Sequence, residues 1–444
     1  MSHCEMSHCE GEQAVAGTTE MQGPSGTPNG AVAVRHGRLP RRSAARTALT
    51  FTGAALAVLL VSSTAVAGYA VLSTVGTVSS NAIDITTPGG TPPPEPPAFG
   101  AIEGGFNLLL VGTDNDANQG EEFGERDATL NDVNILLHVS DDHQSAVAIS
   151  LPRDLVIAHP ECTNPETGEV FGAMFAQPLN DAYERGGLGC VVNTVSGLTG
   201  LPVDYAAVVS FNGVIALSNA VGGVPVCLVE PIEDPESGLN LPEGESVISG
   251  STALAYLRAR YGVGDGSDLS RISNQQAFLS SLLRTVRSGQ TLSDPVKLYG
   301  LAHVAAENMR FSTSLANPAT MISLALSLKD IPLEKIVFVQ YPVVDSSEFS
   351  GKVEPNQVLA DQLMALVQGD QPFLLPDGST GNGVEAGEAA PPAEQPVAEP
   401  PAADPAAPAP VEGSETPAPV TPPVVEGLSG QTAGETTCAR ANSG

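Results

Sequence analysis

The stretch VNILLHVSDDHQSAVAISL, residues 133–151, holds two short apolar runs on either side of a polar turn. Each run is apolar nearly throughout, which is typical of a strand that is buried on both faces of a sheet. Similar runs recur at 106–114, 205–211 and 335–341, and helical patterns fall between the runs, at about 179–199, 212–220, 250–258, 270–288, 295–307 and 317–328. Strands interleaved with helices predict a layered α/β/α domain with a mostly buried sheet.

Composition confines this domain to residues 100–372. Residues 73–99 include the proline-rich TTPGGTPPPEPPA and are predicted to be a linker. Residues 373–444 are rich in Pro, Ala, Glu and Gly, so we predict a disordered tail that ends in a cysteine-bearing segment. The net charge of −31 argues against nucleic acid as a partner.

A membrane anchor is predicted over residues 48–72, because these 25 residues carry no charge and are enough to cross a bilayer. Five arginines precede this segment, so the positive-inside rule places residues 1–47 in the cytoplasm and the domain outside. The alternative is a cleaved signal peptide, with AVAG at 65–68 as the cleavage site.

The cysteines agree with that topology. Cys4 and Cys9 would stay reduced inside the cell. An even set of four lies on the predicted outer side, where disulfides form, namely Cys162, Cys190, Cys227 and Cys438. Four cysteines allow three pairings, and their spacing leaves all three open.

Scarce positive charge gathers in YLRARYGVGDGSDLSRISNQQAF, residues 256–278. Asp268, Arg271 and Gln275 are spaced to share one helical face. We expect the preceding helix to end near Arg258, so that Arg258 and Arg260 reach one ligand. The alternative is a solvated helix surface with local ion pairs.

An anion site is the better interpretation, because a fourth arginine, Arg153, also follows a strand end in LPRD. Sites in open α/β sheets form beyond the carboxyl ends of strands, so Asp114, Asp116, Arg153 and Asp154 are expected to meet there. Carboxylates beside such arginines, Asp114 and Asp132 above all, suit a Mg²⁺ ion that bridges a pyrophosphate. Their alternative role is to cap turns and strand ends.

An ordered run of motifs resembles the LytR-CpsA-Psr (LCP) family over roughly residues 104–345. The segments that carry the resemblance are LLVGTD, LNDVNILLHVS, AISLPRD, LNDAYERGG, LTGLPVDYAAVVSFNGVIALSNAVGGVPV and ALAYLRARYGVGDGSDLSRISNQQAF. The resemblance implies a three-layer α/β/α domain with a central mixed β-sheet, held outside the membrane by one transmembrane helix.

The same resemblance implies a phosphotransferase that moves a glycan from a polyprenyl-pyrophosphate carrier onto cell-wall peptidoglycan. It implies that Asp114 and Asp132 hold Mg²⁺ and that pyrophosphate is held by Arg153, Arg258, Arg260, Arg271 and Gln275. Asp268 would orient these arginines or handle a proton. Two rival hypotheses stay open: a pyrophosphatase that acts on the same lipid, and a non-catalytic, membrane-anchored wall-binding or regulatory protein.

The chain departs from the family pattern at two places. The family commonly has an arginine where Leu130 stands and a lysine where Pro178 stands, so Arg126 and Arg185 are candidates to supply those charges. The ending SGQTAGETTCAR resembles the cysteine-bearing ends of some high-GC Gram-positive relatives. That likeness favours the pairs Cys162–Cys190 and Cys227–Cys438.

A polyprenyl tail needs an apolar cavity, and VVSFNGVIALSNAVGGV, residues 208–224, is a candidate wall. Its apolar positions are Val208, Phe211, Val214, Ile215, Leu217 and Val221. Ordinary core packing explains any single one of them equally well.

Overall fold

The structure is a computed structural model that describes residues 43, 45, 47–58, 61–62, 82–85, 97, 100–115, 129–165, 167–289, 291–387 and 422–442. The chain divides into two units, residues 1–65 and residues 66–444. In the first unit, residues 47–58 are helical. Within the described ranges, every helix is too short or too polar to span a bilayer. Within the predicted span 48–72, residues 59–60 and 63–72 fall outside those ranges, as do Cys4 and Cys9.

A seven-stranded mixed sheet forms the centre of the second unit. The pairs β1–β8 and β3–β14 are parallel, and the other neighbours are antiparallel. In spatial order the strands are β13 (Met309–Phe311), β8 (Tyr205–Val209), β1 (Phe106–Thr113), β2 (Asn131–Val139), β3 (Ala146–Leu151), β14 (Ile336–Gln340) and β18 (Gly430–Thr432). The apolar runs predicted as strands supply the five central strands of this sheet, which confirms them.

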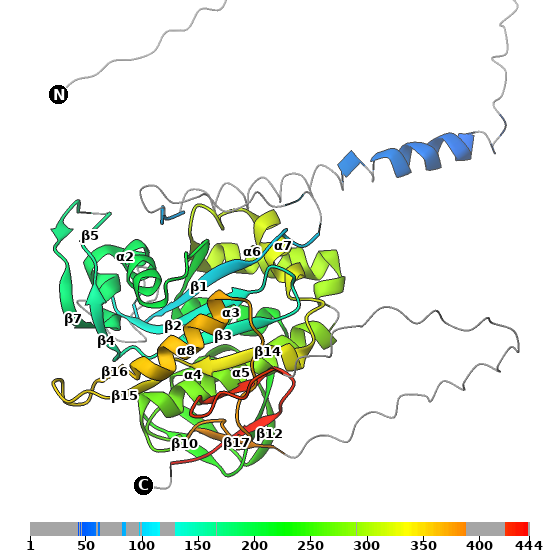
Figure 1. The fold of residues 1–444 in the computed structure, drawn as a ribbon. Coiled ribbons are helices and arrows are strands. Elements are labelled where there is room, and N and C mark those ends of the chain that lie inside the picture. Colours follow the sequence, from blue (N-terminus) through cyan, green and yellow to red (C-terminus); the bar gives the residue numbers. More distant parts are fainter. Residues whose placement is uncertain are drawn as a thin grey trace, which may run out of the picture. The chain divides into compact units, whose positions relative to one another are not determined.

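Helices cover both faces of this sheet, as Figure 1 shows. Leu109 and Val111 of β1 pack in a core with α2 (Ala182–Thr199) and α8 (Gln357–Gln368). Phe106 packs on the opposite face, in a core with α5 (Asp268–Ser288), α6 (Pro295–Asn308) and α7 (Pro318–Ser327). The alternation follows from the two-residue repeat of a strand, and it confirms the predicted α/β/α layers.

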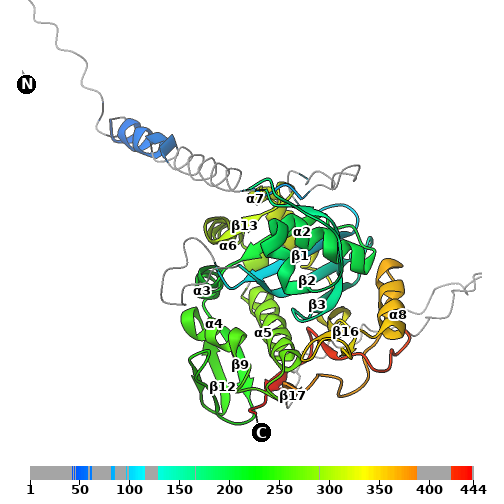
Figure 2. The same cartoon turned by 90° about the vertical axis from the view of Figure 1, so that its left-hand side faces the viewer.

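A second, four-stranded sheet lies beside α4 (Gly250–Arg258) and the start of α5, at the bottom of Figure 2. Phe278 of α5 and Tyr256 of α4 belong to the core beneath it. Its strands, in spatial order, are β12 (Gly244–Ile248), β9 (Val224–Leu228), β19 (Thr437–Ala439) and β17 (Val384–Ala386).

Two of these strands correct the tail prediction. We predicted disorder from residue 373 onward, but residues 373–387 and 422–442 are part of the folded domain. β18 extends the central sheet, and β17 and β19 enter the small one. Composition misled the prediction because a few apolar residues, such as Val384 and Val425, are buried by partners far away in sequence.

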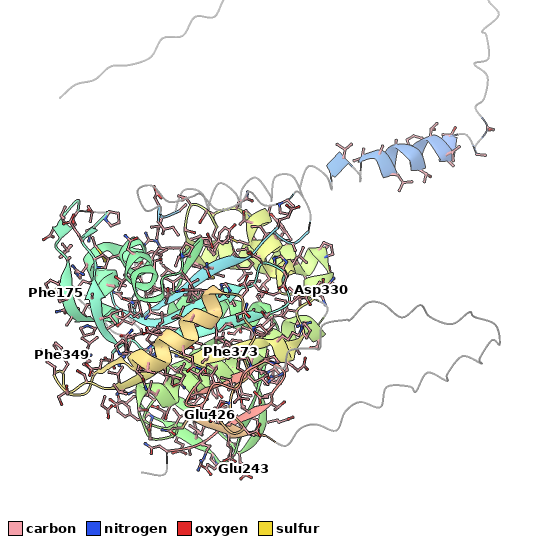
Figure 3. All side chains as sticks on the ribbon, in the orientation of Figure 1. Phe175, Glu243, Asp330, Phe349, Phe373 and Glu426 are labelled. Atoms are coloured by element: carbon pink, nitrogen blue, oxygen red, sulfur yellow. A yellow bond between two sulfur atoms is a disulfide. The ribbon has the colours of Figure 1, made fainter. Side chains whose placement is uncertain are left out.

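Both favoured disulfides, Cys162–Cys190 and Cys227–Cys438, are formed. The first joins α2 to a hairpin that presents Phe175 to solvent at the edge of the domain (Figure 3). The remaining short elements are α3 (Phe211–Ala220), β4 (Val156–His159), β5 (Cys162–Thr163), β6 (Val170–Phe171), β7 (Met174–Pro178), β10 (Ile232–Asp234), β11 (Leu239–Leu241), β15 (Val343–Asp345), β16 (Val353–Pro355) and the 3₁₀ turns Leu179–Asp181, Thr291–Ser293 and Leu333–Lys335.

Candidate anion-binding site

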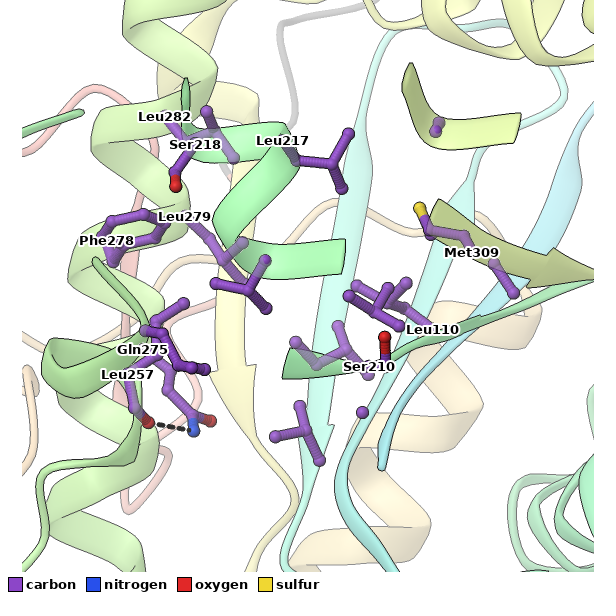
Figure 4. Close-up of a pocket in the computed structure, with 18 of the residues that line it drawn as sticks. Leu110, Ser210, Leu217, Ser218, Leu257, Gln275, Phe278, Leu279, Leu282 and Met309 are labelled. Atoms are coloured by element: carbon purple, nitrogen blue, oxygen red, sulfur yellow. Dashed lines mark hydrogen bonds between the residues drawn. The ribbon is translucent and has the colours of Figure 1, made fainter. Parts of the chain in front are cut away.

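A cavity of about 770 Å³ lies between the central sheet and helices α3, α4, α5, α6 and α7. One part of its wall is polar, and seven of the predicted site residues line it: Asp114, Asp132, Arg153, Arg258, Arg260, Arg271 and Gln275. The rest of the wall is largely apolar, and Figure 4 shows Leu110, Leu217, Leu279 and Met309 facing the cavity from different elements. The arginines therefore converge, although they come from distant parts of the chain.

A β-bulge brings the two predicted metal ligands to the same end of the sheet. Gly112 pairs with Val133 and Thr113 pairs with Asn131, so Asp132 is an extra residue in β2. A bulge re-aims the side chain that it inserts. Asp114 follows the end of β1 directly, and its Oδ1 accepts a hydrogen bond from the Leu130 amide at 3.0 Å.

One network of ion pairs links four charged residues: Asp132, Arg153, Asp268 and Arg271. Arg153 Nη1 donates to Asp132 Oδ1 at 2.8 Å, and Arg153 Nε lies 3.7 Å from Asp268 Oδ1. The same Asp268 oxygen lies 2.5 Å from Arg271 Nη2. Asp268 does not line the cavity, and it is only 8 % exposed between the two guanidiniums. It can therefore orient both, which is one of the two roles we expected.

The predicted end of α4 is confirmed. The helix stops at Arg258, and Ala259 is extended, so Arg258 and Arg260 reach the same cavity. The guanidinium of Arg258 lies 4.5 Å from the centre of the Phe211 ring. Arg260 Nε donates to the Gly266 carbonyl at 3.1 Å, which bends the side chain back over its own loop.

Gln275 ties α5 to the end of α4. Its Nε2 donates to the Leu257 carbonyl at 2.9 Å, the bond drawn in Figure 4. The neighbouring Asn274 Nδ2 donates to the Tyr256 carbonyl at 3.1 Å. Carbonyls in the last turn of a helix lack partners within the helix, so α5 stabilises the turn that carries Arg258.

Burial and charge act against each other on the pKa of Arg153. Burial by itself lowers the pKa, and the carboxylates of Asp132, Asp268 and Asp154 raise it by more. Arg153 therefore stays charged although it is largely shielded from solvent. An anion that enters the cavity meets cations that the fold has already oriented.

Four of the six residues that we predicted to contact a lipid line the cavity: Phe211, Val214, Leu217 and Val221. The other two predictions are wrong as to position. Val208 belongs to the core on the opposite face of the sheet, in register with Val111. Ile215 is displaced about 100° around α3 from Val214 and does not line the cavity.

Asp114 and Asp132 provide oxygen donors but no complete metal site. No group of three or more His, Cys, Asp or Glu side chains suited to a metal occurs among the residues that the structure describes. Mg²⁺ is commonly held by one or two carboxylates together with substrate phosphates and water. The pair, which lines the same cavity as the arginines, fits a cation whose coordination a diphosphate completes.

Several predicted contributions differ in the structure. Arg185 is a buried residue of α2, donates to the Gly172 carbonyl and does not line the cavity, so it does not supply the charge expected there. Lys352 instead forms an ion pair with Asp154, whose Oδ2 lies 3.7 Å from Arg153 Nε. Asp116 and Arg126 lie outside the described residues.

Two residues that support the site, Lys352 and Asp234, were not predicted from the sequence, because neither lies in a recognisable motif. Asp234 Oδ2 accepts the backbone N–H groups of Arg260 at 2.7 Å and Gly262 at 3.0 Å. The only sequence signal was its place in a polar turn after an apolar strand.

Comparison with known proteins gives a consistent picture. The family model described as the LytR_cpsA_psr family matches residues 74–366. The chain is 31 % identical over 291 residues to the cell wall biosynthesis protein LcpA of Corynebacterium glutamicum, which covers 59 % of this chain and 55 % of that protein. It is 26 % identical over 232 residues to the polyisoprenyl-teichoic acid–peptidoglycan teichoic acid transferase TagT of Bacillus subtilis, which covers 51 % of this chain and 66 % of that protein.

Among solved structures, a LytR-Csp2A-Psr enzyme from Actinomyces oris matches with a TM-score of 0.45 and 25 % identity. The match covers 64 % of this chain and 94 % of that one. The chain spans about half the length of the two Corynebacterium glutamicum relatives that it matches, LcpA and LcpB.

Proposed function

Because this chain belongs to the LytR-CpsA-Psr family, we propose that it is a phosphotransferase of cell-wall assembly. It moves a glycan from a polyprenyl-pyrophosphate carrier to a sugar hydroxyl of peptidoglycan. The observation that carries the proposal is the convergence of four arginines on one cavity whose remaining wall is largely apolar. A diphosphate with a long hydrocarbon tail has that same division between a charged end and an apolar body.

The bond changes follow from the substrate. The hydroxyl oxygen of the acceptor attacks the phosphorus next to the glycan, and the bond from that phosphorus to the bridging oxygen breaks. The products are a phosphodiester between glycan and peptidoglycan, and a polyprenyl phosphate. The hydroxyl proton must leave during this step, and a phosphate oxygen of the substrate would accept it, because Asp268 does not line the cavity.

Arg153, Arg258, Arg260 and Arg271 would bind the phosphate oxygens and stabilise charge that builds on the leaving lipid phosphate. Gln275 would hold the turn that presents Arg258. Asp114 and Asp132 would hold Mg²⁺, whose chemical contribution when bound is to neutralise the two phosphates. Phe211, Val214, Leu217 and Val221 would contact the first part of the lipid tail.

The domain would work outside the cell, anchored to the membrane by residues 48–72. The two disulfides support an oxidising compartment, because such bonds are rare in the reducing cytosol.

The test is turnover of a polyprenyl-pyrophosphate-linked glycan by the purified protein, with and without peptidoglycan and with and without Mg²⁺. We expect phosphodiester product only when the acceptor is present, and loss of that product in Arg260→Ala. Phosphate release that does not depend on the acceptor would favour a pyrophosphatase. Unchanged ligation by a folded Arg260→Ala variant would contradict the proposed site.

A further inference from the structure

We propose that the C-terminal segment, residues 436–442, positions the arginine loop, residues 259–267, and thereby sets the affinity of the site for its diphosphate. The nature of the ligand rests on the function proposed above, whereas the contacts between the two segments do not. The C-terminal segment lies far from the loop in sequence and was expected to be disordered.

The C-terminal segment runs along the arginine loop as a short antiparallel partner. The Gly264 amide donates to the Arg440 carbonyl at 3.0 Å, and the Asn442 amide donates to the Gly262 carbonyl at 3.0 Å. Val263 and Ala441 form the bridge between these two bonds. The side chain of Asn442 adds a bond from Nδ2 to the Tyr261 carbonyl at 2.9 Å. The backbone of the loop is thus hydrogen-bonded to a segment that lies far away in the sequence.

Residues 382–383 support both segments. The Arg440 amide donates to the Gly383 carbonyl at 3.1 Å, and Asn382 Nδ2 donates to Asp265 Oδ2 at 3.0 Å. A Cβ atom on Gly383 would lie 2.2 Å from the Ser270 carbonyl oxygen, so the backbone of residue 383 lies directly against the first turn of α5. The loop and the start of the helix that carries Arg271 therefore rest on the same support.

Asp234 holds the other side of the arginine loop. Its carboxylate is buried and accepts the amides of Arg260 and Gly262. Because Arg260 Nε donates to the Gly266 carbonyl, the direction of this guanidinium depends on the shape of the loop itself. Loss of either support should therefore move Arg260 relative to the other three arginines.

The Cys227–Cys438 disulfide keeps the C-terminal segment in place. β19 and β9 pair through only two residue pairs, Cys438 with Cys227 and Ala439 with Leu228. A ladder of that length is weak alone, and a cross-link across 211 residues removes much of the chain entropy that opposes its formation. The disulfide thus adds a covalent link to a segment that β17 also holds, through three residue pairs with β19.

The test compares two full-length double variants, Cys227→Ser with Cys438→Ser, and Cys162→Ser with Cys190→Ser as the matched control. Hydrogen exchange reports on residues 259–267, and calorimetry measures the affinity for geranylgeranyl pyrophosphate. In the first variant we expect faster exchange in the loop and about five-fold weaker binding or more. In the control variant we expect the loop to exchange as in the wild type.

A second variant covers the possibility that the first fails to fold. Asn442→Ala keeps both disulfides and removes one bond to the loop, so we expect faster loop exchange and about two- to five-fold weaker binding. Wild-type loop exchange and affinity in either folded variant would overturn the inference. If the wild type itself did not bind the probe, the proposed function would fail, and the exchange experiment would still decide whether the segment positions the loop.

Discussion

The guanidinium carbon of Arg258 lies 4.5 Å from the centre of the Phe211 ring. Both residues line the cavity, one at the end of α4 and the other at the start of α3. The contact joins a cation of the polar part of the cavity wall to the apolar part. A ligand with a charged head and a hydrocarbon tail would meet both chemistries across this one pair.

Replacing Phe211 by Leu should remove the cation–π interaction that orients Arg258. The side chain stays apolar but loses the negative face of the ring, an interaction of about 0.5 to 2 kcal/mol. We expect KM for the lipid-linked substrate to rise about three- to ten-fold, with little change in Tm. Phe211→Tyr keeps the ring face and should retain near wild-type KM, and equal KM values for the two variants would argue against a role for the contact.

Filling the apolar cavity should discriminate between lipids by length. Leu217→Trp places a larger side chain in the cavity wall, so it should weaken binding of a long polyprenyl pyrophosphate by about ten-fold or more. Binding of inorganic pyrophosphate should change little. Ile215→Trp, on the same helix but outside the cavity wall, is the control and should leave both affinities near wild type. Equal losses in the two variants would show that the tail binds elsewhere.

His159 should make folding stability depend on pH. Burial, and secondarily the charge of Arg185, lower the pKa of His159 from 6.5 to about 4. Between these values the unfolded chain binds the proton more readily, so stability is lost as pH falls from about 6.5 toward about 4. The loss attributable to this one side chain is on the order of 3 kcal/mol.

Thermal unfolding at pH 7 and pH 5 measures this loss of stability on acidification. His159→Phe should show a smaller drop in Tm on acidification than the wild type. His303→Gln, at a partly exposed histidine paired with Glu307, serves as the control and should keep the wild-type drop in Tm. An unchanged drop in His159→Phe would place the acid sensitivity elsewhere.

Two Gly→Ala changes should act with opposite signs on stability. Gly383→Ala forces a methyl group against the Ser270 backbone and should cost about 1 to 3 kcal/mol. Gly197→Ala, in α2, meets no atom within 4 Å and should stabilise the fold by about 0.5 to 1 kcal/mol. Denaturant unfolding measures both, and a neutral Gly383→Ala would show that residues 382–383 do not press on α5.

The central layers could be predicted from the sequence because each helix and strand has its own characteristic pattern of apolar residues. The run around Ile149 is apolar on both sides, and β3 is buried along its whole length. β1 and β2 are buried only in part, because Leu108, Leu110 and Leu137 line the cavity. The end of α4 at Arg258 could also be predicted, because two arginines spaced by two residues converge only if the helix has stopped between them. The lipid wall was harder, since Val208 and Ile215 have the right chemistry but point away from the cavity.

The α/β/α layers, the family and the charged residues of the cavity wall could be inferred from the sequence, since they depend on local periodicity and ordered motifs. The groups that support those charged residues became visible only in the folded chain. Asp234, Lys352 and the segment around Asn442 have no local signature, because their partners are brought near only when the chain has folded. Hydrogen bonds and ion pairs act over a few ångströms in space, and separation along the chain says nothing about that distance.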